Sequence, residues 1–231
     1  KVINPLFLDD LYIKLNESGF NEKSLEKLLR KIYHFKIFDP SCGSGNFLII
    51  AFRELCLLEI EIYKKLQEIN PQKWKISSSG ILLKQFYGIE IDSFAHQLCR
   101  VSLLISQHQM HLHFQEVFES AIQTFNIKSL NKIHHSNATE INWNDVCEKD
   151  DKYEIFVVSN PPYKGSRGLS VRQKADMNHV FSDIKGYKNL DYISCFFYLG
   201  AKYIKNSNIK LAFVSTSSIN QGEQVPTLWP H

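Results

Sequence analysis

The chain has 231 residues, of which 44% are hydrophobic and 22% charged, and its formal net charge is only +3, a composition that is typical of a globular protein and argues only weakly for a polyanionic partner. Its five cysteines show no C-x-x-C spacing, which argues against a disulfide framework and a zinc site, and no apolar run approaches the roughly 18 residues that span a membrane. We therefore expect a cytoplasmic protein that neither holds a metal ion nor binds a membrane.

Apolar periodicity along the chain predicts strands that alternate with helices. Helices are predicted over residues 25–33, from Asn46 to about Ile69, from an N-cap at Ser93 to about Phe114, and over residues 190–205. Strands are predicted over residues 35–38, 86–91, 136–141, 153–158 and 209–215. Residues 115–136 are expected to add one helix and a polar connection, and residues 164–188 a mobile loop with at most a short helix. The alternation predicts an α/β fold with a doubly wound, mainly parallel sheet.

A glycine-rich turn follows the first predicted strand, in the run Asp39-Pro40-Ser41-Cys42-Gly43-Ser44-Gly45-Asn46-Phe47. Glycines let the backbone turn tightly and approach a ligand closely, and nucleotide-like cofactors lie at the first turn of open α/β sheets. The run lacks the third glycine or the lysine of phosphate-binding loops. Because Asp39 also disfavours a polyanion, we expect a cationic or amino-bearing ligand here. A purely structural turn from strand to helix is the alternative.

An acidic residue, Glu90, ends the second predicted strand. In doubly wound nucleotide-binding folds an acid at this place accepts hydrogen bonds from ribose hydroxyls. Glu90 lies further from the glycines than usual, because a long helix and a loop intervene. A carboxylate that caps the following helix is the alternative interpretation.

The run Ser159-Asn160-Pro161-Pro162-Tyr163 stops the fourth predicted strand abruptly. Two prolines make a rigid turn, so the Asn160 side-chain oxygen and the Pro161 carbonyl are preorganised acceptors for the hydrogens of an exocyclic amino group. Tyr163 offers a face on which a planar base can stack, which is worth about 1–3 kcal/mol. A base in a duplex must be flipped out to reach such a turn. An ordinary turn with two prolines is the alternative.

In this order, the runs at 39–47, Gly88-Ile89-Glu90 and 160–163 resemble those of the S-adenosylmethionine-dependent N6-adenine DNA methyltransferases. The resemblance implies a Rossmann-like, class I methyltransferase fold. It also implies that residues 39–47 hold the methionine part of the cofactor, that Glu90 and Ile91 bind its ribose side, and that Asn160, Pro161, Pro162 and Tyr163 receive a flipped adenine.

Three further runs, "PLFLDDL" near the start, "NATEINWNDVC" at 137–147 and "STSSINQGEQVPTLWP" near the end, resemble the MmeI-like (type IIL) restriction-modification enzymes. By that resemblance Asn137 and Ala138 lie beside the cofactor adenine. The parent chain would also carry a nuclease domain and a target-recognition domain, and would act on double-stranded DNA. We therefore expect a chain truncated at both ends, with a helical lead-in at 1–35 and an incomplete methyltransferase core at 36–231.

Four basic residues follow the Asn-Pro-Pro-Tyr turn, and we expect them to contact DNA phosphates: Lys164, Arg167, Arg172 and Lys174. Two alternative functions stay open. The same turn suits N4 of cytosine or a glutamine side chain of a protein, and the chain could instead be a catalytically silent, DNA-binding fragment.

Overall fold

The computed structural model describes residues 2–119 and 127–230 and contains one five-stranded sheet. All neighbouring strands run parallel, in the order β3-β2-β1-β4-β5. The strands are β1 (Phe35–Asp39), β2 (Phe86–Glu90), β3 (Ile133–His135), β4 (Glu154–Ser159) and β5 (Lys210–Phe213). The predicted α/β fold with a parallel sheet is thereby confirmed.

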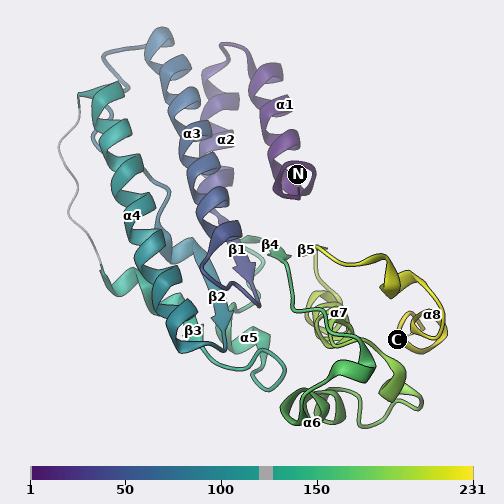
Figure 1. Cartoon of the computed structure of the whole chain (residues 1–231). Helices are drawn as coiled ribbons and strands as arrows, with labels where there is room; N and C mark the ends of the chain where they lie inside the picture. Colours follow the sequence, from purple (N-terminus) through teal and green to yellow (C-terminus); the bar gives the residue numbers. More distant parts are fainter. Residues whose placement is uncertain (1, 120–126, 231) are drawn as a thin grey trace.

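Helices cover both faces of this sheet (Figure 1). One side carries α1 (Asp9–Ser18), α2 (Glu22–Tyr33), α3 (Asn46–Ile69) and α4 (Ser93–Phe118), and the other carries α5 (Trp143–Val146), α6 (Val171–Val180), α7 (Ile193–Ile204) and α8 (Gln224–Leu228). Short 3-10 and π turns connect them: η1 (Asn4–Leu8), η2 (Leu83–Gln85), η3 (Ile127–Lys132), η4 (Ser166–Gly168), η5 (Tyr187–Asn189) and η6 (Ser217–Asn220). None of the helices in the described ranges is long and apolar enough to cross a lipid bilayer.

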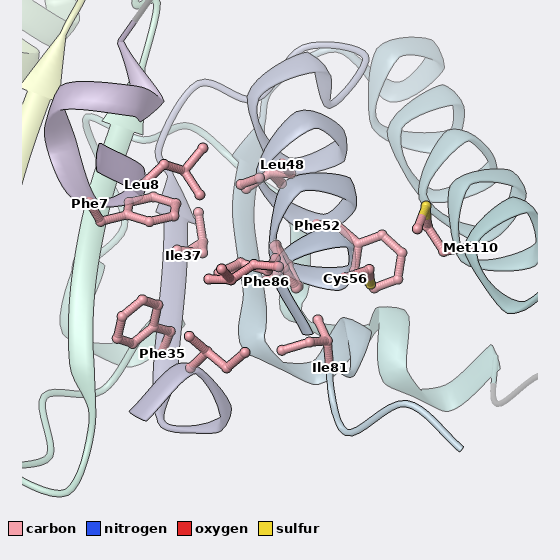
Figure 2. Close-up of a cluster of buried hydrophobic side chains, with 14 of the residues drawn as sticks. Phe7, Leu8, Phe35, Ile37, Leu48, Phe52, Cys56, Ile81, Phe86 and Met110 are labelled. Atoms are coloured by element: carbon pink, nitrogen blue, oxygen red, sulfur yellow. The ribbon is translucent and has the colours of Figure 1, made fainter. Parts of the chain in front are cut away.

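Successive side chains of β1 point to opposite faces of the sheet, and all of its residues are buried. Both faces must therefore be covered by helices, as in a doubly wound fold. Ile37 belongs to the core on the α3 side, where Figure 2 shows it beside the aromatic rings of that core. Phe38 points to the opposite face, where its ring lies 5.6 Å from that of Trp143 and 5.7 Å from that of Tyr203. Burying each such side chain contributes about 1.5–3 kcal/mol, so both layers hold the strand in place. Of the segment predicted as a lead-in, 1–35, the described residues 2–35 pack into the α3-side core.

Most predicted helices and strands agree with the structure within a few residues, and α3 has the predicted bounds. The strand predicted at 136–141 is wrong. There the chain turns, because the Asn137 carbonyl accepts the backbone N–H groups of Glu140 and Ile141 at 3.1 Å, and β3 precedes this turn. The N-cap of α4 is Asp92 rather than Ser93, since its carboxylate accepts the N–H of Ala95 at 2.7 Å.

The structure also tests the predictions for two less regular regions, residues 115–136 and 164–188. Helix α4 continues to Phe118, so the start of the predicted middle segment belongs to this helix, and residues 120–126 of that segment lie outside the described residues. The segment 164–188 contains the ten-residue helix α6. Its first turn is held by a capping box, in which Ser170 and Gln173 each bond the other's backbone N–H.

The order of the sheet reverses between β1 and β4, since β1 pairs with β2 on one side and with β4 on the other. In open α/β sheets ligands bind outside the carboxyl ends of the strands at this switch point. The glycine-rich turn after β1 and the Asn-Pro-Pro-Tyr turn after β4 therefore lie at neighbouring strand ends.

Candidate active site

Two glycines of the turn after β1 adopt left-handed backbone angles, with φ of +54° at Gly43 and +89° at Gly45. A Cβ atom at Gly45 would lie 2.7 Å from the Sγ atom of Cys99 in α4. Gly45 therefore meets two separate requirements, the backbone conformation and the close approach of α4. The helix that follows begins at Asn46, whose side chain is exposed, while those of Ser44 and Phe47 are half-buried.

Glu90, at the end of β2, holds this turn. Its Oε2 atom accepts the N–H of Gly43 at 2.8 Å, and its Oε1 atom accepts the N–H of Asp92 at 2.7 Å. The N–H of Cys42 also bonds the carbonyl of Ile89 at 3.0 Å. Because each carboxylate oxygen has two lone pairs, Glu90 can still accept hydrogen bonds from a ligand.

Asp39, at the end of β1, links the glycine-rich turn to the residue that precedes the Asn-Pro-Pro-Tyr turn. It is only 1% exposed, and its Oδ1 atom accepts the N–H of Ser41 at 3.0 Å and the hydroxyl of Ser159 at 2.5 Å. Burial raises the pKa of the Asp39 carboxyl to about 7, although both hydrogen bonds favour the ionised form. The side chain does not line the cavity described below, so its direct contact with a ligand stays a prediction.

The turn after β4 presents its polar and aromatic groups outward. Asn160, Pro162 and Tyr163 are exposed, whereas Pro161 is buried. The chain is held on both sides of the turn: the Ser159 carbonyl accepts the N–H of Val214 at 2.9 Å, and the Lys164 carbonyl accepts that of Tyr192 at 2.8 Å. The turn therefore offers an amide and a ring on an anchored backbone.

A cavity of about 480 Å³ opens beside these strand ends, a volume within the usual range for small-molecule sites. Its walls include sequence-predicted residues from all three motifs, from the turn after β3 and from the basic segment: Pro40, Ser41, Glu90, Ile91, Asn137, Ala138, Pro162 and Arg172. Ala138 is fixed in this wall because its carbonyl accepts the indole N–H of Trp143 at 2.8 Å.

The other predicted residues lie around this cavity rather than in its walls. Seven residues of the glycine-rich run do not line it, namely Asp39, Cys42, Gly43, Ser44, Gly45, Asn46 and Phe47. Lys164, Arg167 and Lys174 are exposed on the segment after the Asn-Pro-Pro-Tyr turn, and Arg172 alone of the four basic residues reaches the cavity wall. The roles of these residues in binding cofactor or DNA stay predictions.

Apart from Arg172, sequence reasoning missed the part of the wall that α6, α7 and their N-caps contribute. These residues are Ser170, Gln173, Asp176, Tyr192 and Phe196. One available signal was the Ser170-x-x-Gln173 capping box, which marks the start of a helix. Ile89, Asp92 and Ser136, also in the wall, directly adjoin residues that were predicted. Among the described residues no group of three or more His, Cys, Asp and Glu side chains could hold a metal ion.

Comparisons with known proteins agree with this geometry. Residues 15–231 match the family described as "MmeI, DNA-methyltransferase domain". DNA methyltransferase A of Bacillus subtilis (strain 168) is 44% identical over 230 residues, which cover 99% of this chain and 26% of that protein. A putative type II restriction enzyme and methyltransferase of Methanocaldococcus jannaschii is 32% identical over 105 residues, covering 45% of this chain and 9% of that protein.

A solved structure of the Type IIL restriction-modification enzyme MmeI in complex with DNA has a TM-score of 0.91 and 40% sequence identity. The match covers 99% of this chain and 30% of that chain. The chain thus spans about a quarter of the length of its curated relative from Bacillus subtilis and under a third of the solved MmeI chain.

Proposed function

This chain belongs to the family of MmeI DNA-methyltransferase domains, and from that premise we propose that it transfers a methyl group from S-adenosylmethionine to N6 of an adenine in double-stranded DNA. The observation that carries the proposal is the shared wall at the switch point. Pro162 belongs to the Asn-Pro-Pro-Tyr turn and also lines the cavity. A ligand in the cavity and a base on the turn would therefore be neighbours.

The cavity suits the cofactor by its chemistry. The carboxylates of Glu90 and Asp176 line it together with the apolar side chains of Ile91 and Phe196. Such a wall favours a ligand with positive charge, hydroxyl and amino donors and a flat ring. When bound, S-adenosylmethionine supplies an electrophilic methyl group on a positively charged sulfur. Glu90 would accept hydrogen bonds from its ribose, and the turn over residues 40–45, of which Pro40 and Ser41 line the cavity, would hold its methionine part.

The Asn-Pro-Pro-Tyr turn prepares the acceptor. The Asn160 Oδ1 atom and the Pro161 carbonyl accept the two hydrogens of the adenine amino group, which favours a pyramidal nitrogen with an available lone pair. Both acceptors are uncharged and lie on an anchored turn, so little reorganisation is needed. Tyr163, which is 46% exposed, stacks on the flipped base and offsets part of the few kcal/mol that unstacking costs. The amino nitrogen would take the methyl group as its bond to sulfur breaks, which would leave a neutral thioether, and one amino proton would then pass to water.

The DNA partner is supported by the solved relative, which was captured in complex with DNA. The exposed side chains of Lys164, Arg167 and Lys174 follow the catalytic turn directly, where they can contact the phosphates around a flipped nucleotide. Because this chain covers 26% of one relative and 30% of another, we propose that the parent enzyme also carries nuclease and target-recognition parts.

The test uses the variant Asn160→Ala of the full-length protein. Cofactor binding, measured by calorimetry, should stay within about threefold, whereas DNA methylation should fall by about 100-fold or more, because a preorganised acceptor is lost. Glu90→Ala should instead weaken cofactor binding itself, by more than Asn160→Ala does. Asn131→Ala, an exposed asparagine in η3, is the control that should change neither.

Product analysis separates the acceptor classes. With a cofactor whose methyl group carries an isotope label, mass spectrometry of the digested DNA should find the labelled methyl group on N6 of adenine. Label on N4 of cytosine, or on a protein glutamine when protein is offered, would replace the proposed acceptor. Unchanged turnover of Asn160→Ala would exclude the mechanism itself.

A further inference from the structure

The side chain of Asn137 has no hydrogen-bonding capacity left for a ligand. Its Oδ1 atom accepts both the N–H of Thr139 at 3.1 Å and the hydroxyl of Thr139 at 2.8 Å. Its Nδ2 atom donates one hydrogen to Glu140 at 3.0 Å and the other to Asp176 at 2.9 Å. An amide side chain offers two lone pairs and two hydrogens, so all four positions are used.

The partners also determine which way the amide faces. Two donors surround the oxygen and two carboxylates surround the nitrogen, so the reversed amide would set its NH2 group against the N–H of Thr139 and its oxygen against the carboxylates. Asn137 therefore shapes the turn after β3 and orients its neighbours. A direct hydrogen bond from its side chain to a ligand would require one of these bonds to break.

Asp176 is the acceptor that this arrangement presents to the cavity. It comes from α6, is 3% exposed and lines the cavity wall. Its Oδ1 atom accepts from Asn137, and its Oδ2 atom accepts from the hydroxyl of Tyr192 at 2.6 Å. Each oxygen keeps a second lone pair. In the part of the chain that the structure describes, Asp176 forms no ion pair, and the two side chains that donate to it, Asn137 and Tyr192, are neutral.

We propose that Asp176 accepts a hydrogen bond from the 6-amino group of the cofactor's adenine and thereby makes the site selective for amino-bearing purines, with Asn137 as its positioning residue. The inference rests on the proposed cofactor and adds the side chain that reads its base. A carboxylate accepts hydrogen bonds but cannot donate one when ionised. It therefore favours an amino group and opposes the carbonyl oxygen of a 6-oxopurine.

Apolar neighbours in the same wall supply the remaining part of this recognition. Phe196, from α7, and Ile91, after β2, line the cavity together with Asp176. Phe196 is 4% exposed, whereas Ile91 is 43% exposed. An adenine ring bound between these two side chains would direct its 6-amino edge toward the carboxylate of Asp176. Discrimination by a single amino group is large when the site's own polar group is otherwise left unpaired.

The experiment compares two product-like ligands on the full-length protein, S-adenosylhomocysteine and S-inosylhomocysteine, which differ in the 6-amino and 6-oxo groups. Calorimetry gives a ratio of their dissociation constants. Wild type should prefer the amino ligand by about tenfold or more, as expected for a hydrogen bond to a charged group. In Asp176→Ala this ratio should fall to within about threefold of unity.

Glu140→Ala is the matched control, because Glu140 is the other carboxylate bonded to the Asn137 amide and does not line the cavity. If Asp176 only held Asn137, both variants would weaken the two ligands equally and keep their ratio, and the proposal would be overturned. Should Asp176→Ala fail to fold by circular dichroism, Asp176→Asn replaces it. That variant should also lower the ratio, and an unchanged ratio in it would overturn the proposal.

The wild-type result separates this inference from the function on which it rests. Binding of S-adenosylhomocysteine without any preference over the inosyl ligand overturns the role of Asp176 and leaves the proposed methyltransferase function intact. Binding of neither ligand overturns both.

Discussion

At the scale of single residues, Asp39 connects the two motifs that were recognised separately in the sequence. Its one oxygen atom Oδ1 bonds both Ser41, in the glycine-rich turn, and Ser159, the residue before Asn160. The bond to Ser159 crosses from β1 to β4, the strands that flank the switch point. A change at Asp39 should therefore disturb the glycine-rich turn and the Asn-Pro-Pro-Tyr turn together.

The raised pKa of Asp39 predicts a dependence of stability on pH. A folded-state pKa of about 7, against an ordinary value of 3.8, means that folding favours the protonated acid. The stability that this group contributes is therefore fully present below about pH 4 and is lost as pH rises through 7. A change in pKa from 3.8 to about 7 corresponds to roughly 4 kcal/mol in the free energy of unfolding.

Urea unfolding of wild type and Asp39→Asn between pH 4 and 8 measures this effect. The free energy of unfolding of wild type, relative to the variant, should fall as pH rises, because asparagine does not titrate. A difference that stays constant over this range would show that folding does not raise the pKa of Asp39.

At the scale of elements, a buried carboxylate in the middle of α3 positions the connection that leads to β2. Glu59 is 0% exposed; it accepts the hydroxyl of Tyr33 at 2.6 Å, the N–H of Gly80 at 2.6 Å and the hydroxyl of Ser79. Burial raises the pKa of this carboxyl. The connection leads through Gln85 into β2, so one acceptor joins α2, α3 and the segment that enters β2.

Loss of this acceptor should destabilise the fold. Glu59→Ala leaves three donors without their partner, and each buried unsatisfied group costs about 1–3 kcal/mol. We expect the free energy of unfolding in urea to fall by about 3 kcal/mol or more. Glu61→Ala, an exposed glutamate of the same helix, should change it by less than about 0.5 kcal/mol. Equal effects of both variants would contradict the assigned role of Glu59.

At the scale of the whole molecule, the sheet has an edge at β5. Within the described residues β5 pairs with β4 alone, and Leu211, Ala212 and Phe213 are half-buried. An edge strand with unpaired N–H and C=O groups can pair with another chain. A second exposed feature, the apolar face of α4 with Val101 and Ile105, lies beside β3 at the opposite end of the sheet.

We expect this 231-residue chain to associate with itself through β5. Light scattering after size exclusion should give a mass above 26.9 kDa that rises with concentration. Val101→Glu tests the other surface, and it should leave the association unchanged. A monomer at all concentrations would contradict the prediction, and a monomer only in Val101→Glu would assign the contact to α4.

Much of the site was predictable because it depends on local sequence. Apolar spacing and Pro71 delimit α3, glycines permit the turn after β1, and two prolines fix the turn after β4. These features act over a few residues, and the resemblance to a known family added their roles. The strand at 136–141 was misplaced because Asn137 forms a turn there, which so short a run of residues does not reveal.

By itself, the sequence determined the α/β class, the positions of most helices and strands, and the three runs that contribute residues to the cavity wall, because periodicity and backbone restriction are properties of neighbouring residues. Only the tertiary structure decided which distant groups meet. Asn137, Asp176 and Tyr192 come from a turn and two helices, and Asp39 reaches Ser159 across two strands. Such contacts depend on strand order and helix packing, which are fixed when the two cores form on opposite faces of the sheet.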